Sequence, residues 1–363
     1  MSLNPKRTMH AMMRALAALM IAAAMTGLGT PDTRAQSNGT LSPDAAGSAV
    51  VVMYHRFNET SFPSTNIRLE QFEAHLKELT NSKYTVMALP KIMATLKAGR
   101  KLPPRTVAIT IDDAFASVYR EAWPRLRAAK LPFTLFVATN QISHGAAEYM
   151  TWDQVRELAN AGVTIGNHSV SHAHLADQGR ARIRAELDKS NGQFVKELGV
   201  KPTLHAYPYG EASAIVIEEV RKAGFTAAFG QHSGVLHSKA KKMYLPRFAM
   251  NENFGSPQRF RMAINALPLY AADISPSDST LGKGAANPPA FGFTIGEKVP
   301  RLTQLACYSS QHGKLAIERL GPRRMEVRLP SAFRSGRARI NCTLPAYEAR
   351  WRWFGYQFYI PKH

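Results

Sequence analysis

Short apolar runs of strand length alternate with amphipathic segments of helix length from about residue 49 to residue 229. The apolar runs are rich in β-branched residues, which is typical of parallel strands covered on both faces. Strands are predicted over 49–53, 85–87, 106–111, 133–138, 163–166, 204–207 and 226–229, and helices over 69–80, 90–98, 117–129, 151–161, 180–198 and 213–223. Repeated strand–helix units predict right-handed crossovers. We therefore expect an α/β fold, a distorted and incompletely closed TIM-like barrel with its chemistry at the C-terminal ends of the strands.

The first 48 residues differ in composition from the rest. Three basic residues precede an apolar run at 15–28 that is too short to span a bilayer comfortably, which predicts a signal peptide over residues 1–35. An uncleaved membrane anchor is the alternative. Residues 36–48 are small and polar, as expected of a linker. The sequence therefore predicts a periplasmic or secreted protein without a stable membrane span.

The pattern changes after residue 267. Residues 271–290 are rich in Ser, Gly, Ala and Pro, and we expect them to link the barrel domain (49–270) to a small all-β, sandwich-like domain (291–363). Strands are predicted over 314–320, 324–329, 338–344 and 351–360. The aromatic residues between 351 and 358 indicate either a sugar-stacking surface or a strand with one buried face. Cys307 and Cys342 are the only cysteines, and an even pair in an exported protein favours a disulfide over two buried thiols.

Two adjacent acidic residues, Asp112 and Asp113, follow the apolar run at 106–111. Successive side chains on a strand point to opposite faces, so both carboxylates serve one site only if the chain leaves regular strand geometry there. We therefore place them on the loop before the helix predicted at 117–129. The alternative is that one of them only caps that helix.

Two histidines four residues apart, His168 and His172, follow the strand predicted at 163–166. They would share a face if this segment turned helical. Because parallel strands end at the same side of a sheet, the pair is expected near Asp112 and Asp113. A carboxylate and two imidazoles hold a divalent metal with a position left for water, and a spare carboxylate moves protons. These four residues predict a metal-dependent hydrolase.

The segments around these residues resemble the motifs of a known enzyme family. Residues 110–115 (TIDDAF) resemble the first motif of the polysaccharide deacetylase family, the NodB-homology or carbohydrate esterase family 4 domain, and residues 168–172 (HSVSH) match its second motif. Residues 206–211 (AYPYGE) are similar to its aromatic-Pro-Tyr-Gly loop, and residues 51–55 (VVMYH) to its opening strand. The likeness runs from about residue 50 to about residue 267 and implies a (β/α)7 barrel that hydrolyses linear amide C–N bonds.

The resemblance also implies roles for individual residues. Three metal ligands are implied, for a divalent metal expected to be Zn²⁺: Asp113, His168 and His172. Asp112 is implied as the general base that takes a proton from the attacking water, and the backbone N–H of Tyr209 as part of an oxyanion site. Substrate contacts are implied for three more residues: His55, Tyr207 and Pro208.

The sequence departs from the family pattern at three points. Ala114 stands where a glycine usually follows the aspartate pair. The arginine common at the start of the third motif is replaced, and we expect Arg247 to orient or charge-balance Asp112 instead. The late histidine that acts as general acid has no unambiguous counterpart. His232 and His237 are candidates, and His232 is preferred because it lies nearer the end of the strand predicted at 226–229.

The chain is strongly basic, with a formal net charge of +20. From Arg301 onward it holds twelve Lys and Arg residues against three Asp and Glu. Such a field favours an anionic partner, which we expect to be an anionic envelope polymer bound through the C-terminal domain, unless the charge serves solubility alone. No nucleic-acid module is visible, and the predicted export signal argues against nucleic acid as a partner.

The combined features predict a metal-dependent hydrolase that removes N-acetyl groups from an amino-sugar polysaccharide. Poly-N-acetylglucosamine, a chitin-like polymer and the glycan of peptidoglycan are the candidate substrates. A non-catalytic carbohydrate-binding protein of polysaccharide export is a second hypothesis, but binding alone has no need for Asp112 beside a complete set of metal ligands. An amidase that acts on a small non-sugar amide is a third, and it would share the same metal chemistry.

Overall fold

The computed structural model describes residues 47–362, apart from residues 283, 297 and 298. The predicted signal peptide and all but the end of the predicted linker at 36–48 lie outside the described residues. Within the part of the chain that the structure describes, no helix is long and apolar enough to cross a membrane.

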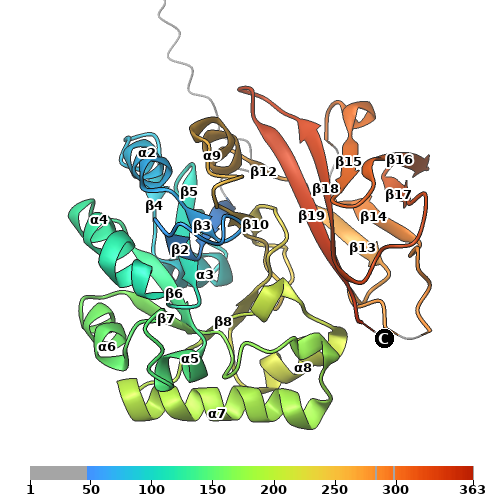
Figure 1. Ribbon diagram of the computed structural model, residues 1–363. Helices are drawn as coiled ribbons and strands as arrows, with labels where there is room; N and C mark the ends of the chain where they lie inside the picture. Colours follow the sequence, from blue (N-terminus) through green and yellow to red (C-terminus); the bar gives the residue numbers. More distant parts are fainter. Residues whose placement is uncertain (1–46, 283, 297–298, 363) are drawn as a thin grey trace, which may run out of the picture. The chain divides into compact units, whose positions relative to one another are not determined.

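A nine-stranded sheet forms the first part of the described chain (Figure 1). Its strands follow the order β10-β1-β5-β6-β7-β8-β9, with β4 paired to β5 and β11 paired to β1. All of these pairs are parallel except β10 with β1, which confirms the α/β class. The strands are β1 (Ser48–Tyr54), β4 (Thr85–Val86), β5 (Thr106–Asp112), β6 (Phe133–Val137), β7 (Thr164–Asn167), β8 (Leu204–Ala206), β9 (Ala227–Phe229), β10 (Leu236–His237) and β11 (Phe248–Ala249). β2 (Arg56–Phe57) and β3 (Asn66–Ile67) form a separate pair.

Helices alternate with these strands and lie around them in Figure 1. They are α2 (Leu69–Leu79), α3 (Leu89–Lys97), α4 (Trp123–Ala128), α5 (Thr139–Ser143), α6 (Trp152–Asn160), α7 (Arg180–Leu198), α8 (Ala214–Lys222) and α9 (Pro257–Ile264). The single turns are η1 (Val118–Ala122), which is π-helical, and the 3₁₀ turns η2 (Leu175–Asp177), η3 (Pro208–Gly210) and η4 (Leu302–Gln304). α6 begins with a capping box in which Thr151 and Gln154 each accept a hydrogen bond from the other's backbone N–H.

The central strands supply two hydrophobic cores, one from each face. In β1, Val50 and Val52 pack into a core that also contains Phe72 of α2, whereas Ala49 and Val51 face a second core. The second core gathers side chains from β1, β5, β6, β8, β9 and β10 and therefore fills the barrel interior. This division between two buried faces explains why the strands are apolar at nearly every position instead of alternating.

A short segment, residues 245–249, closes the gap between the two edges of the barrel. Leu245 forms a parallel bridge with Phe229 of β9, and Phe248 pairs with Val52 of β1. Arg247 lies between these two contacts. The barrel is thus completed by an irregular segment instead of a full strand, which agrees with the distorted barrel expected from the sequence.

A second sheet of eight strands follows, in the order β12-β19-β18-β15-β16-β17-β14-β13. These strands are β12 (Leu267–Pro268), β13 (Ala271–Ser275), β14 (Phe291–Ile295), β15 (Ala306–Ser309), β16 (Gly313–Leu320), β17 (Arg324–Arg328), β18 (Gly336–Pro345) and β19 (Trp351–Ile360). β16 pairs with β15 through its first residues and with β17 through the rest. Phe291 of β14 packs against Phe358 of β19, although these strands are far apart in the strand order. The sheet therefore folds over its own core, as expected of a sandwich-like domain.

Three details of this sheet bear on the sequence expectations. β13 falls within the segment expected to be a linker. Its side chains are partly or fully exposed, so the sequence has no buried apolar face that would predict a strand there. Cys307 and Cys342 lie opposite each other on β15 and β18 and form a disulfide. On β19, Tyr356 and Phe358 are buried, as expected of a strand with a buried face, whereas Trp351 at its start is exposed.

Candidate active site

The polar residues of the three motifs lie at the C-terminal ends of neighbouring strands. β5 ends at Asp112, and β7 ends at Asn167, directly before His168. The turn η3, which contains Tyr209, follows β8. Because these strands are parallel, their C-terminal ends meet at one side of the barrel, where such folds place their active sites.

The chain leaves strand geometry directly after Asp112, as the sequence predicted. Asp113 has a φ of 75° and Ala114 a φ of 58°. This left-handed turn allows two adjacent carboxylates to serve one site, although residues of a regular strand would point to opposite faces. A left-handed conformation costs a residue with a Cβ about 1–2 kcal/mol. The cost at Ala114 explains why the family usually has a glycine at this point.

The loop that carries His168 and His172 is not helical, so the condition under which the two would share a helical face is not met. Ser169 and His172 have φ values of 66° and 56°, so the two histidines converge through a tight loop and not through one helical face. The Ser169 hydroxyl accepts a hydrogen bond from the His172 N–H at 3.2 Å. The spacing of four residues was therefore informative for a different structural reason.

Glu186 of α7 holds this loop in place. Its buried carboxylate accepts hydrogen bonds from the backbone N–H groups of Val170 at 3.1 Å and Ser171 at 2.9 Å. The Ser171 hydroxyl donates to the same carboxylate at 2.7 Å. Glu186 could not be predicted from the sequence, because it is one of several charged residues in a long polar helix and no local pattern marks it.

Asp113, His168 and His172 form a compact cluster of ligand atoms. Asp113 Oδ1 lies 3.3 Å from His168 Nε2 and 3.2 Å from His172 Nε2, and the three atoms lie within 4.8 Å of one another. Asp113 Oδ1 and His168 Nε2 are buried and have no aligned hydrogen-bond partner among the described residues. Buried polar atoms are otherwise almost always paired, so this convergence fits a divalent cation.

The orientation of His168 suits a ligand. Its Nδ1 lies 2.7 Å from the Ala206 carbonyl oxygen, which leaves Nε2 directed toward Asp113. Burial by itself would raise the pKa of the Asp113 carboxyl, but the nearby imidazoles of His168 and His172 outweigh this effect and hold the pKa well below its ordinary value. Asp113 is therefore an anion, as a metal ligand must be.

Asp112 forms a closed ion pair with Arg247. Arg247 Nη1 donates to Asp112 Oδ1 at 2.6 Å and Nη2 donates to Oδ2 at 2.8 Å, and both side chains are fully buried. Arg247 Nε donates to the Gly230 carbonyl at 2.9 Å, which fixes the guanidinium. Burial would raise the pKa of Asp112, but the Arg247 charge outweighs it and keeps the pKa below its ordinary value.

His55 follows β1 and reaches the same site. Its Nε2 lies 3.9 Å from Asp112 Oδ2. Burial lowers the pKa of His55, and the charges of Asp113 and Asp112 oppose this shift only in part. The structure therefore brings His55 beside the two carboxylates, where the resemblance expected a substrate contact.

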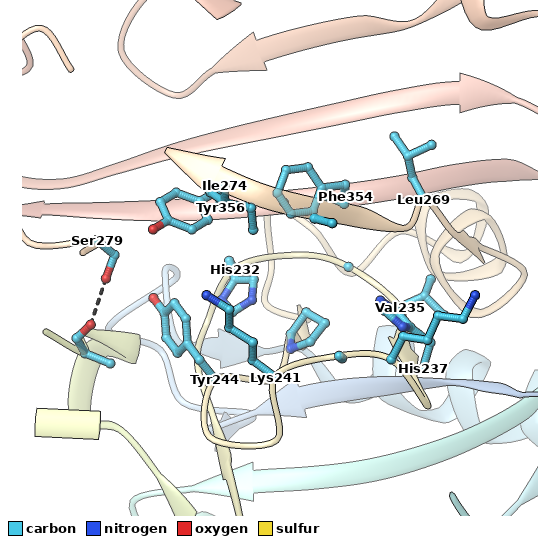
Figure 2. Close-up of a pocket in the computed structure, with 18 of the residues that line it drawn as sticks. His232, Val235, His237, Lys241, Tyr244, Leu269, Ile274, Ser279, Phe354 and Tyr356 are labelled. Carbon is cyan, nitrogen blue, oxygen red and sulfur yellow. Dashed lines mark hydrogen bonds between the residues drawn. The ribbon is translucent and has the colours of Figure 1, made fainter. Parts of the chain in front are cut away.

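His232 does not join this group, which corrects its expected role as general acid. It lines a pocket of about 310 Å³, together with Tyr244 and, from β19, Phe354 and Tyr356 (Figure 2). Neither aspartate of the pair nor either histidine of the second motif lines that pocket. Burial lowers the pKa of His232 to about 3, so near neutral pH the ring is a neutral imidazole without the imidazolium proton that a general acid would donate. The other candidate, His237, lines the same pocket.

The residues of the third motif differ in their surroundings. The Tyr209 ring contacts the His172 ring at a centroid distance of 4.5 Å and is half-buried. Tyr207 is fully buried and its hydroxyl donates to the Met243 carbonyl at 2.7 Å, so its side chain belongs to the core. Pro208 is buried as well. The expected substrate contacts of Tyr207 and Pro208 are therefore not supported.

Comparisons with known proteins point to the family that the sequence motifs resemble. Residues 99–228 match the family model described as polysaccharide deacetylase. The chain is 24% identical over 234 residues to a poly-beta-1,6-N-acetyl-D-glucosamine N-deacetylase of Staphylococcus aureus (strain MRSA252), which covers 57% of this chain and 80% of that protein. It is 26% identical over 214 residues to a protein of the same name from Escherichia coli (strain K12), with 48% of this chain and 32% of that protein covered.

A solved structure gives the same result. IcaB from Ammonifex degensii has a TM-score of 0.54 and 25% identity, and the match covers 60% of this chain and 98% of that chain. The region matched by the family model contains Asp112, Asp113 and the histidine loop, whereas residues from 229 onward lie outside it. Residues 99–228 therefore match a polysaccharide deacetylase domain, and the chain is similar to proteins named as deacetylases of a polysaccharide.

Proposed function

We propose that this protein is a metal-dependent N-deacetylase of an amino-sugar polysaccharide, with poly-N-acetylglucosamine as the first candidate substrate. The observation that carries the proposal is the cluster of Asp113, His168 and His172, whose unpaired buried atoms lie beside the charged pair of Asp112 and Arg247. The names of the relatives from Staphylococcus aureus and Escherichia coli favour this substrate over a chitin-like polymer or peptidoglycan.

The ligand set favours zinc. One carboxylate and two imidazoles, with room for further ligands, are the donors of many catalytic zinc sites. When bound, such a cation would polarise the acetamide carbonyl and lower the pKa of a water molecule. His168 and His172 would have to be neutral to act as ligands, so metal affinity should decrease as the pH falls.

The residues of the chain divide the remaining work. Asp112 is ionised because of Arg247, so it is able to accept a proton from the attacking water as general base. Arg247 keeps the carboxylate oriented through two hydrogen bonds. The backbone N–H of Tyr209 would donate to the oxygen that becomes negatively charged in the transition state. The products would be acetate and a free amine on the sugar.

One experiment separates this proposal from the two alternatives. The metal content of the purified protein is measured, and acetate release is followed with oligomers of poly-N-acetylglucosamine, chitooligosaccharides, peptidoglycan and small acetamides. Acetate release from one glycan class supports the proposal and names the substrate. Bound glycan without acetate release would favour a carbohydrate-binding protein, and activity on small amides alone would favour an amidase.

The partner and the location of the protein remain parts of the same proposal. The C-terminal sheet exposes Arg301, Arg319, Arg323, Arg328 and Arg334, which favours contact with an anionic envelope polymer. A substrate outside the cytoplasm would agree with the export signal expected over residues 1–35. Detection of the processed protein in the periplasm or the culture medium would test this location.

A further inference from the structure

We propose that Gln357 of β19 is a positioning residue of the deacetylase site, through which the C-terminal sheet holds the loop that carries Tyr209. The inference rests on the proposed function, because it assigns the Tyr209 N–H to the transition state. Gln357 lies far outside residues 99–228, the region that matches the family model. The active site would thus include a residue from the second sheet.

The Gln357 side chain bridges two groups of opposite polarity. Its Nε2 donates to the carbonyl oxygens of Tyr209 at 3.2 Å and Gly210 at 3.0 Å. Its Oε1 accepts a hydrogen bond from Arg339 Nε at 2.9 Å. The side chain is 1% exposed, so water does not replace these bonds easily. With acceptors on one side and a cationic donor on the other, only one orientation of the amide satisfies every group.

The Tyr209 loop needs external support because its backbone is unusual. Tyr209 has a φ of 58° and Gly210 a φ of 69°, so two successive residues are left-handed. Such a conformation at a residue with a Cβ persists only where the surroundings impose it. Tyr244 supplies a further bond, from its hydroxyl to the Gly210 carbonyl at 2.9 Å. The carbonyls of both left-handed residues are therefore held by side chains distant in sequence.

This loop is in direct contact with the metal cluster. The Tyr209 ring meets the His172 ring edge-on at 4.5 Å and stacks on His174 at 4.0 Å. Arg337 of β18 lies 5.5 Å from the centre of the same Tyr209 ring. A shift of the loop would move the Tyr209 N–H relative to the substrate carbonyl, and oxyanion donors act only when they are placed within a few tenths of an ångström.

The same interface offers a matched control. The Tyr359 hydroxyl, also on β19, donates to Asp177 Oδ2 at 2.6 Å and makes no hydrogen bond to the Tyr209 loop. Tyr359→Phe and Gln357→Met each remove hydrogen bonds between the sheet and the barrel and keep the approximate volume of the side chain. Of the two, only the Gln357 substitution removes hydrogen bonds to the Tyr209 loop.

The test compares steady-state kinetics on an acetylated glucosamine oligomer, with metal content measured in parallel. Gln357→Met should lower kcat about 10- to 100-fold with little change in KM, because it weakens an interaction made in the transition state. Metal stoichiometry should stay at the wild-type value. Tyr359→Phe should change kcat less than about twofold. Gln357→Glu keeps the contact with Arg339 but cannot donate to the two carbonyls, so it should repeat the kcat loss if the Met variant folds poorly.

Hydrogen exchange supplies a readout that does not depend on the reaction. The amides of residues 209–211 should exchange faster in Gln357→Met than in Tyr359→Phe. Equal exchange and equal kcat in the two variants, or a kcat loss that follows loss of metal, would overturn the positioning role. Wild-type protein that releases no acetate from any glycan would instead refute the proposed function, and the exchange experiment would still decide whether Gln357 holds the loop.

Discussion

Asp112 and Asp113 are adjacent in sequence and differ in nearly every physical respect. Both oxygens of Asp112 receive hydrogen bonds from Arg247, so its charge is neutralised by the protein itself. Asp113 instead faces two imidazoles, and its Oδ1 has no aligned partner among the described residues. One turn thus separates two electrostatic environments. A carboxylate with its own counter-charge stays ionised without a metal, and a carboxylate without one suits a cation.

The largest effect is expected at the metal cluster that contains Asp113. His172→Ala should abolish stoichiometric metal binding and acetate release together, because it removes one of three protein ligands. Metal analysis of the purified variant checks this. His144→Ala is the control, since His144 is exposed and is not part of the cluster. Full metal occupancy in His172→Ala would mean that other residues build the site.

Asp112, which is paired with Arg247, should respond differently to substitution. Asp112→Asn should retain the metal and lose about 100- to 10,000-fold in kcat, because an amide does not accept the proton of the attacking water. Kinetics and metal analysis on the same preparation separate the two effects. Near-normal turnover would show that another residue is the base, and His55 would be the next candidate because it lies 3.9 Å from Asp112.

Without the charge of Arg247, the buried Asp112 carboxylate should destabilise the protein. Arg247→Met leaves a buried carboxylate unpaired, which should destabilise the protein by about 3–5 kcal/mol at neutral pH. Urea unfolding measures this loss. Equal stability of variant and wild type would show that Asp112 is not charged in the native protein.

The pH dependence of this effect has a definite sign. In the wild type, the pKa of Asp112 is lowered, so its contribution to stability is present above the unfolded-state pKa and disappears as the pH falls through the folded-state pKa. In Arg247→Met, burial should raise the pKa instead, and the deficit should shrink as acid protonates the carboxyl. Any remaining activity should also be lost at a higher pH than in the wild type.

Removal of the metal should have a smaller effect, which is expected on thermal stability. A cation that binds only the native state stabilises it by about 2.7 kcal/mol when its free concentration is one hundred times Kd. A chelator should therefore lower the melting temperature of the wild type and of Asp112→Asn, but leave His172→Ala unchanged. A chelator effect of equal size in all three proteins would place the bound metal elsewhere.

The exposed arginines of the C-terminal sheet should give the smallest effect. Charges exposed to solvent are screened over about 8 Å at physiological salt, so retention on an anionic polymer should weaken as salt is added. Replacing Arg319, Arg323 and Arg328 by glutamine should weaken it further without changing kcat on short neutral oligomers. Retention that is indifferent to both changes would leave these arginines a role in solubility only.

The sequence predicted those parts of the site that depend on local patterns. Asp112, Asp113 and His168 follow apolar runs, and strand ends of a parallel sheet converge, so their proximity could be expected. The choice of Arg247 to balance Asp112 relied on charge, and the structure places its guanidinium on that carboxylate. Arg247 reaches Asp112 because it lies on the closing segment 245–249, whose sequence has no regular hydrophobic pattern.

The features of the site that the sequence did not predict can also be explained physically. His232 lies three residues beyond the end of β9, and a sequence does not show into which pocket a loop directs a side chain. The sequence left open whether the histidine loop is helical, because the Glu186 carboxylate that accepts hydrogen bonds from its N–H groups lies on the following helix. Gln357 is 148 residues away from Tyr209, so only the docking of the second sheet reveals the contact.

The position of Arg247 in the closing segment links acid–base chemistry to closure of the barrel. The same residues that pair with β9 and β1 also place the Arg247 guanidinium on Asp112. A chain that ends before residue 245 would contain both motifs of the metal cluster and still lack the group that orients the expected base.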